Sequence, residues 1–179
     1  LLGESNLTYD AMNQMAASSP VGSKGLSILP FGNGAERMLG DRDIGAQVHH
    51  LNFNIHRKPE ILRAVQEGVA FSFKYGIDIM QSLKIQPSVL KAGAANMFLS
   101  PIFCRTLASV AGVTIELYNT DGAQGAARAA AVGAGIVPRL QDAFKGLTAI
   151  QRIEPEMNKT DYLEAYSRWL APLNRSLQS

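Results

Sequence analysis

The sequence contains little of what several protein classes need. Its one cysteine, Cys104, excludes an internal disulfide, so we expect a cytoplasmic protein in a reducing environment. The formal net charge is only +2, and lysine and arginine form no long run, which argues against a nucleic-acid partner. No apolar run approaches the roughly 18 residues of a membrane span, so we expect no membrane partner either.

The beginning of the sequence also lacks features of a complete chain. Its first residue is Leu1 rather than methionine, and no basic region followed by an apolar segment precedes Gly3. We therefore expect a piece of a longer chain. The 179 residues are 46% hydrophobic and 18% charged, which is ordinary for a globular protein and fits a single domain over residues 1–179.

The stretch from Ser88 to Gly112 is the most informative part of the sequence. A short apolar run, Val89–Leu90, precedes the small residues 92–96, and Ser100 and Pro101 then begin a helix as N-cap and first helical residue. A strand, a small-residue turn and a helix in this order let a ligand lie against the backbone. The simpler interpretation is a tight connection in an α/β sheet, and this stretch alone favours it.

A second small-residue turn follows one unit later and strengthens the ligand interpretation. After a predicted strand at Val113–Leu117, either Thr120 or Asp121 is expected to cap a helix that runs to about Gly135. The helix consists largely of alanine and glycine. Its N-terminus suits phosphate oxygens. For the small residues in the body of the helix we favour a different explanation, namely that a neighbouring element packs almost against the helix backbone.

Hydrophobic periodicity predicts the remaining elements of an α/β domain with a mixed or parallel sheet. The other predicted helices are Tyr9–Ala17, Pro59–Lys84 and Asn158–Leu173, and a short strand is predicted at Ala149–Glu154. One sheet is expected to contain the strands Leu26–Phe31, Ala46–Asn52, Val89–Lys91 and Val113–Leu117. The helix Pro59–Lys84 is expected to pack on it through Leu62, Val65, Val69 and Phe73, with another element close to Gly68 and Gly76.

Candidate metal-binding and phosphate-binding side chains are few. His49, His50 and His56 lie close in sequence, but a metal site needs convergent ligands at defined spacing, so we favour structural roles and expect no metal site. Arg37 follows a glycine-rich loop and could contact a phosphate. A contact of its side chain with Glu36 or a backbone carbonyl, which would brace the loop, is the preferred interpretation.

Four motifs in unbroken order resemble the C-terminal domain of the FGGY family of carbohydrate kinases, and within it the xylulokinase branch. They are the segment Gly25–Arg37, the helix Arg63–Phe71 with its Arg-Ala-x-x-Glu-Gly pattern, the turn Ala92–Asn96 followed by Phe98, and the segment Asp121–Ala127. Each motif alone is weak, but together they cover nearly the whole chain. The turn departs from the pattern of many relatives, since it holds one glycine where they have two or three.

The resemblance implies an actin-like ATPase, ribonuclease-H-like fold, with a mixed sheet flanked by helices. Residues 1–179 would be the C-terminal, nucleotide-binding half of a two-domain sugar kinase that uses ATP and Mg²⁺. Adenosine would lie against Ala92, Gly93 and Ala94, with a polar contact from Asn96. The absent N-terminal half would supply most of the sugar pocket and the catalytic aspartate, so we expect no catalytic residue here.

Several alternatives stay open beside the transfer of the ATP γ-phosphate to D-xylulose. Another kinase of the family, acting on ribulose, gluconate or glycerol, would share the same motifs. A non-enzymatic actin-like ATP-binding domain or a plain α/β interaction domain would lack the upstream catalytic aspartate. The expected partners are ATP or ADP, the sugar and a second copy of the chain in a homodimer.

Overall fold

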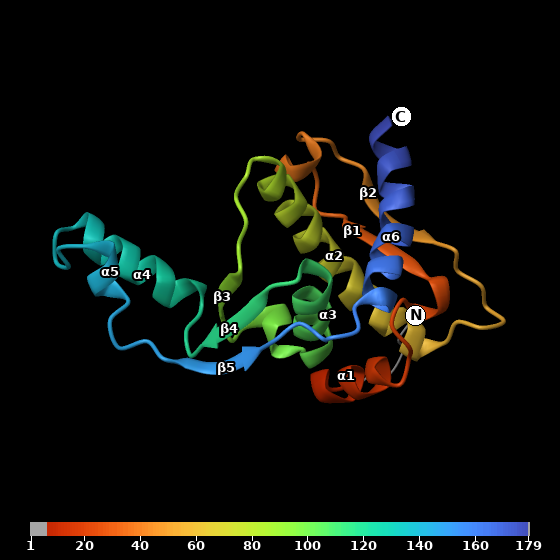
Figure 1. The fold of residues 1–179 in the computed structure, drawn as a ribbon, viewed down its shortest axis with the longest axis horizontal. Coiled ribbons are helices and arrows are strands. Elements are labelled where there is room, and N and C mark those ends of the chain that lie inside the picture. Colours follow the sequence, from red (N-terminus) through yellow and green to blue (C-terminus); the bar gives the residue numbers. More distant parts are fainter. Residues whose placement is uncertain (1–6, 179) are drawn as a thin grey trace.

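The computed structural model describes residues 7–178, which form the helices and strands of an α/β fold (Figure 1). The expectations about Leu1 and Gly3 lie outside the described residues. The α-helices are α1 (Tyr9–Ala17), α2 (Lys58–Ser82), α3 (Pro101–Ala111), α4 (Gly122–Gly133), α5 (Leu140–Ala143) and α6 (Thr160–Gln178). The strands are β1 (Ser27–Phe31), β2 (Gly45–His49), β3 (Val89–Gly93), β4 (Thr114–Tyr118) and β5 (Ala149–Ile153). Short 3₁₀ helices lie at Ser23–Gly25, Arg37–Leu39 and Asn96–Leu99.

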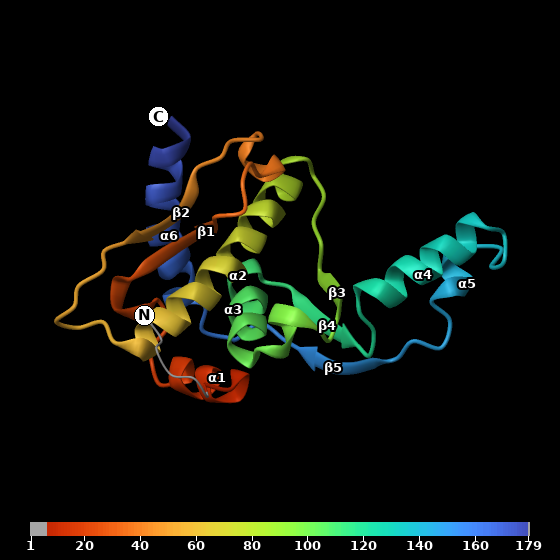
Figure 2. The same ribbon diagram turned by 180° about the vertical axis from the view of Figure 1, so that it is seen from behind.

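The strands form two sheets rather than one, so the prediction of a single sheet is wrong. Strand β1 pairs antiparallel with β2, whereas β4 lies between β3, its parallel neighbour, and β5, its antiparallel neighbour. The reason is that α2 has two buried faces. Phe71 belongs to an apolar core with β1 and α6, while Ala70 and Ile77 belong to a second core with α3 and β4. The helix therefore runs between the sheets (Figure 2).

The predicted apolar stripe of α2 is only partly buried. Leu62 and Ile77 are buried and Val69 is half-buried, but Val65 is 42% exposed and Phe73 is 45% exposed. Phe73 packs edge-on against the rings of Phe98 and Phe103 on the second core, whereas the expected anchoring role of Val65 is wrong. Apolar periodicity misplaces the buried face because polar side chains of α2, among them Arg63, Gln66 and Glu67, are themselves buried.

A buried ion pair on α2 fixes the segment that precedes β1. The Glu67 carboxylate accepts hydrogen bonds from the backbone N–H of Gly22 and the hydroxyl of Ser23, both at 2.9 Å. Arg63 donates to Glu67 from Nε at 2.7 Å and to the carbonyl of Ser19 at 2.8 Å. Both carboxylate oxygens of Glu67 and two guanidinium nitrogens of Arg63 therefore have partners, as a buried charge pair requires.

The glycine predictions for α2 have opposite outcomes. A Cβ atom on Gly68 would lie 2.3 Å from the carbonyl oxygen of Ile28 on β1, which confirms the expected close approach. At Gly76 the same atom would meet no described residue within 4 Å, so within residues 7–178 that expectation is wrong.

Helix α6 covers β1 and completes the first core. Its predicted inward residues are all buried: Tyr162, Ala165, Tyr166, Trp169 and Leu173. The indole N–H of Trp169 donates to the carbonyl of Ile28 at 2.8 Å. The helix continues through Pro172 and extends beyond the predicted end at Leu173.

Local capping chemistry sets the beginnings of three helices. The side chains of Thr8, Ser100 and Asp121 accept hydrogen bonds from backbone N–H groups in the first turns of α1, α3 and α4. These caps confirm the predicted beginnings of α1 and α3, and they select Asp121 rather than Thr120 for α4.

Helices α4 and α5 project from one end of the molecule in both views (Figures 1 and 2). No residue of α4 is buried, and a Cβ on Gly125 or Gly133 would meet nothing within 4 Å. Within residues 7–178, the expected close packing against the body of α4 is therefore wrong.

Candidate functional site

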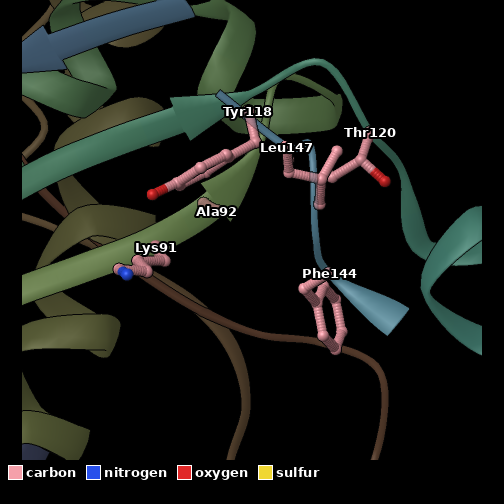
Figure 3. Close-up of a pocket in the computed structure, with 7 residues that line it drawn as sticks. Lys91, Ala92, Tyr118, Thr120, Phe144 and Leu147 are labelled. Atoms are coloured by element: carbon pink, nitrogen blue, oxygen red, sulfur yellow. The ribbon is translucent and has the colours of Figure 1, made fainter. Parts of the chain in front are cut away.

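A hollow lies where the parallel strands β3 and β4 end (Figure 3). Its volume is about 430 Å³, within the range of small-molecule sites. Its lining residues are Lys91, Ala92, Gly93, Tyr118, Thr120, Phe144 and Leu147. Helix α3 connects the two strands, so the hollow lies at the carboxyl ends of a β-α-β unit, where open α/β sheets commonly bind ligands.

Gly93 allows the two strand ends to come together at this hollow. A Cβ on Gly93 would lie 2.3 Å from the carbonyl oxygen of Thr120, a distance that real Cβ atoms do not adopt. The backbone N–H groups of Ala94 and Thr120 both donate to the carbonyl of Tyr118, at 2.9 and 2.8 Å. The small-residue turn after β3 is therefore bonded directly to the last residue of β4, which also holds the turn that follows it.

The four residues predicted for the site divide into two pairs. Ala92 and Gly93 line the hollow. Ala94 is half-buried and packs on the second core, and Asn96 is exposed at a left-handed φ of +53°. Neither of these two residues belongs to the lining.

Sequence reasoning missed most of the remaining lining. Tyr118 could have been found, because the alternation in β4 buries Ile115 and Leu117 and so directs Tyr118 to the other face. The sequence indicates Thr120 only as a possible N-cap of α4. Phe144 and Leu147 carried no signal, because they reach the hollow only through the path of the chain after α4.

Polar contacts surround the hollow and hold its walls in place. The Tyr118 hydroxyl donates to the Glu116 carboxylate at 2.8 Å, and this bond raises the pKa of the Tyr118 phenol above its usual value. The phenol therefore remains protonated at neutral pH. On the other side, Arg128 donates to the Thr120 hydroxyl at 2.7 Å. No aspartate or glutamate is among the described residues that line the hollow.

The histidine residues lie elsewhere. His56 is buried, its Nδ1 accepts from the backbone N–H of Asn52 at 2.9 Å, and its Nε2 lies 3.3 Å from the carbonyl of Lys24, so its role is structural. Burial is the main cause that lowers the pKa of His49, followed by the charge of nearby His50. Residues 7–178 contain no group of three or more metal-ligating side chains.

The glycine-rich loop after β1 is held by a different arginine from the one predicted. The Arg42 guanidinium donates to the carbonyl of Leu177 on α6, and the backbone of Arg42 pairs with that of Glu36. Within residues 7–178 the Arg37 side chain makes neither of the two contacts expected for it, so the predicted brace is wrong. The reason is that α6 passes beside Arg42, which the local sequence does not indicate.

Comparisons with known proteins identify the family and agree with the fold. The model of the C-terminal domain of the FGGY family of carbohydrate kinases matches residues 2–134. The chain is 26% identical to a xylulose kinase of Haemophilus influenzae over 175 residues, which cover 95% of this chain and 35% of that protein. It is 30% identical to the L-xylulose/3-keto-L-gulonate kinase of Escherichia coli over 171 residues, or 91% of this chain and 32% of that protein.

Solved structures are similar over almost the whole chain. A xylulose kinase from Rhodospirillum rubrum superposes with a TM-score of 0.75 at 22% identity, covering 99% of this chain and 36% of that one. Plasmodium falciparum glycerol kinase with ADP superposes with a TM-score of 0.72 at 20% identity, covering 95% of this chain and 34% of that one.

The fold is therefore the actin-like, ribonuclease-H-like fold that the family resemblance implies. The family model matches residues 2–134, which are most of the chain, so the chain belongs to the FGGY family of carbohydrate kinases. It spans about a third of the length of the curated relatives that it matches. None of the helices in residues 7–178 is long and apolar enough to cross a lipid bilayer.

Proposed function

We propose that residues 1–179 are the C-terminal, nucleotide-binding half of an ATP-dependent sugar kinase. The observation that carries this proposal is the hollow at the ends of β3 and β4, which the turn Ala92–Gly93 and Thr120 form together. Family membership supplies the class of reaction. The similar fold of a glycerol kinase described with ADP supports a nucleotide as the ligand.

In this proposal the adenosine part of ATP or ADP lies in the hollow. Ala92 and Gly93 present a flat backbone surface, and the Thr120 hydroxyl offers a hydrogen bond. Ala94 and Asn96 follow directly, and the exposed Asn96 amide is available for a polar contact. We assign no catalytic residue to this chain, because no carboxylate that could act as a base lines the hollow within residues 7–178.

Mg²⁺ accompanies ATP in phosphoryl transfer, but the described residues do not fit a protein-held site for it. They contain no group of three or more metal-ligating side chains. Mg²⁺ commonly binds substrate phosphates with only one or two carboxylates. We therefore assign the ion no ligand in residues 7–178.

The sugar we propose is D-xylulose, phosphorylated to D-xylulose 5-phosphate as a step of xylose metabolism in the cytoplasm. The supporting observation is that two relatives are named for kinases of xylulose. Gluconate, ribulose and glycerol are the alternatives within the family, and similar folds include a gluconate kinase and a glycerol kinase. Most of the sugar pocket would belong to the N-terminal half, and a homodimer is the proposed assembly.

The test uses the full-length protein and a coupled assay for ADP release. D-xylulose, L-xylulose, gluconate, ribulose and glycerol are compared at equal concentration, and D-xylulose is expected to give the highest kcat/KM. The variant Asn96→Ala should raise the KM for ATP by a few-fold to tenfold, because a hydrogen bond contributes about 0.5–1.5 kcal/mol. The KM for the sugar should not change. Absence of sugar-dependent ADP release with all five compounds would reject the proposal.

A further inference from the structure

Phe144 is an aromatic side chain that no core of the molecule uses. Its ring is 44% exposed, and it belongs to neither apolar core. It nevertheless lines the hollow, together with Leu147, from the segment that follows α5 (Figure 3). This segment lies beyond residues 2–134, the part of the chain that the family model matches.

We infer that Phe144 is the residue on which the base of the nucleotide stacks, and this inference rests on the proposed function. The hollow has one wall from the ends of β3 and β4, with Ala92 and Tyr118, and a second wall from Phe144 and Leu147. A planar ligand between them meets an aromatic ring and aliphatic carbon on its faces. Aromatic rings bind nucleobases in this way because every base has a π-face.

The ring is held in place although its segment is on the surface. The Arg128 guanidinium lies 5.9 Å from the centre of the Phe144 ring, and the same guanidinium donates to the Thr120 hydroxyl at 2.7 Å. Arg128 therefore connects Phe144 to Thr120 in the turn after β4, and these contacts help to hold the ring beside the hollow.

The turn that presents Phe144 is also fixed by local ion pairs. The Asp142 carboxylate lies 2.9 Å from Nε of Arg139 and 2.6 Å from Nζ of Lys145. Hydrogen bonds from these two cations, first that of Arg139, lower the pKa of Asp142, so the carboxylate stays charged near neutral pH. Arg139, which precedes Phe144, and Lys145, which follows it, thus both pair with the Asp142 carboxylate.

The lining favours a base over phosphate at this wall. Phe144 and Leu147 are apolar, and Lys91 on the β3 wall is the one cationic residue among the described lining residues. Phosphate oxygens need cations or N–H groups, and the side chains of Phe144 and Leu147 contain neither. The chemical group that suits it is a flat, uncharged heteroaromatic ring.

The experiment measures nucleotide binding to the full-length protein by calorimetry and by steady-state kinetics. Phe144→Ala should raise the Kd and the KM for ATP roughly five- to hundredfold, the range expected for one lost base-stacking contact. The KM for the sugar should stay within twofold. Phe144→Tyr should restore ATP affinity, and Phe53→Ala, which removes a ring that is 73% exposed outside the hollow, is the matched control and should have no effect.

A tryptophan probe reports the stacking itself. Within this chain the one native tryptophan, Trp169, is buried in the first core, so a fluorescence change specific to Phe144→Trp comes from the new residue. ATP should quench this fluorescence with the same Kd as calorimetry, whereas inorganic tripolyphosphate, which has no base, should not.

The outcomes separate this inference from the proposed function. If the wild-type protein binds no ATP, the proposed function fails. If the wild type binds ATP and Phe144→Ala binds it equally well, or tripolyphosphate quenches Phe144→Trp as ATP does, the nucleotide site stands and the role of Phe144 is rejected.

Discussion

Gly93 shows how much one residue controls at this site. Its φ is not in the left-handed region, so the need for glycine is steric, because a Cβ would overlap the carbonyl of Thr120. A backbone carbonyl cannot move aside as a flexible side chain can. The close contact therefore makes the shape of the hollow depend on the absence of a side chain at residue 93.

The variant Gly93→Ala tests this dependence. It should destabilise the protein by roughly 1–3 kcal/mol through overpacking and also weaken ATP binding, because the turn after β4 must shift. Thermal denaturation and calorimetry measure the two effects. Gly125→Ala is the control, since its Cβ meets nothing within 4 Å, and it should be neutral or stabilise helix α4 by up to about 1 kcal/mol. A Gly93→Ala protein with unchanged stability and affinity would contradict the steric argument.

At the scale of elements, α2 organises the domain because it packs on both sides. It supplies Phe71 to the first core and Ala70 and Ile77 to the second. Its buried pair, Arg63 and Glu67, holds the segment before β1 through backbone groups. The position of β1 against α2 therefore depends on charge pairing as well as on apolar packing.

We predict that Glu67→Gln destabilises the protein by about 3–5 kcal/mol, because it leaves the Arg63 guanidinium buried without a counter-charge. Urea unfolding measures the free energy. The matched control is Glu156→Gln, which removes the exposed pair with Arg105 at 3.7 Å and should cost less than about 1 kcal/mol. Equal losses in the two variants would show that burial of the pair has no special effect.

At the scale of the whole molecule, the chain contains a hollow that, within the described residues, no carboxylate side chain lines. Helices α4 and α5 project from the body, and no residue of α4 is buried. Phosphoryl transfer requires a positioned base and closure over the substrates. No carboxylate lines the hollow within the described residues, so we propose that catalysis requires the remainder of the protein.

The isolated 179-residue chain should accordingly show no ADP release with D-xylulose, whereas the full-length protein should. Circular dichroism and ATP titration of the isolated chain are measured beside the coupled assay, so that loss of folding is recognised. Turnover by a folded isolated chain would mean that a catalytic base lies within this sequence.

The sequence alone determined the features that depend on neighbours within one or two helical turns. Thr8 and Ser100 cap their helices through N–H groups three residues away, and the spacing of Tyr162, Tyr166 and Trp169 placed one face of α6 in the core. The order of the four motifs indicated the family. The small residues around the end of β3 indicated Ala92 and Gly93, two of the residues that line the hollow. Such signals depend on residues that are close together in the sequence, so they can be recognised without the tertiary structure.

Only the tertiary structure decided which strands pair and which side chains share the hollow. Periodicity identifies an apolar face but not its partner, so it could not show that α2 separates two sheets. Phe144 reaches Ala92 and Thr120 only because the chain returns after α4. Contacts between residues far apart in sequence depend on the path of the backbone in space, and in this protein they build one wall of the proposed nucleotide site.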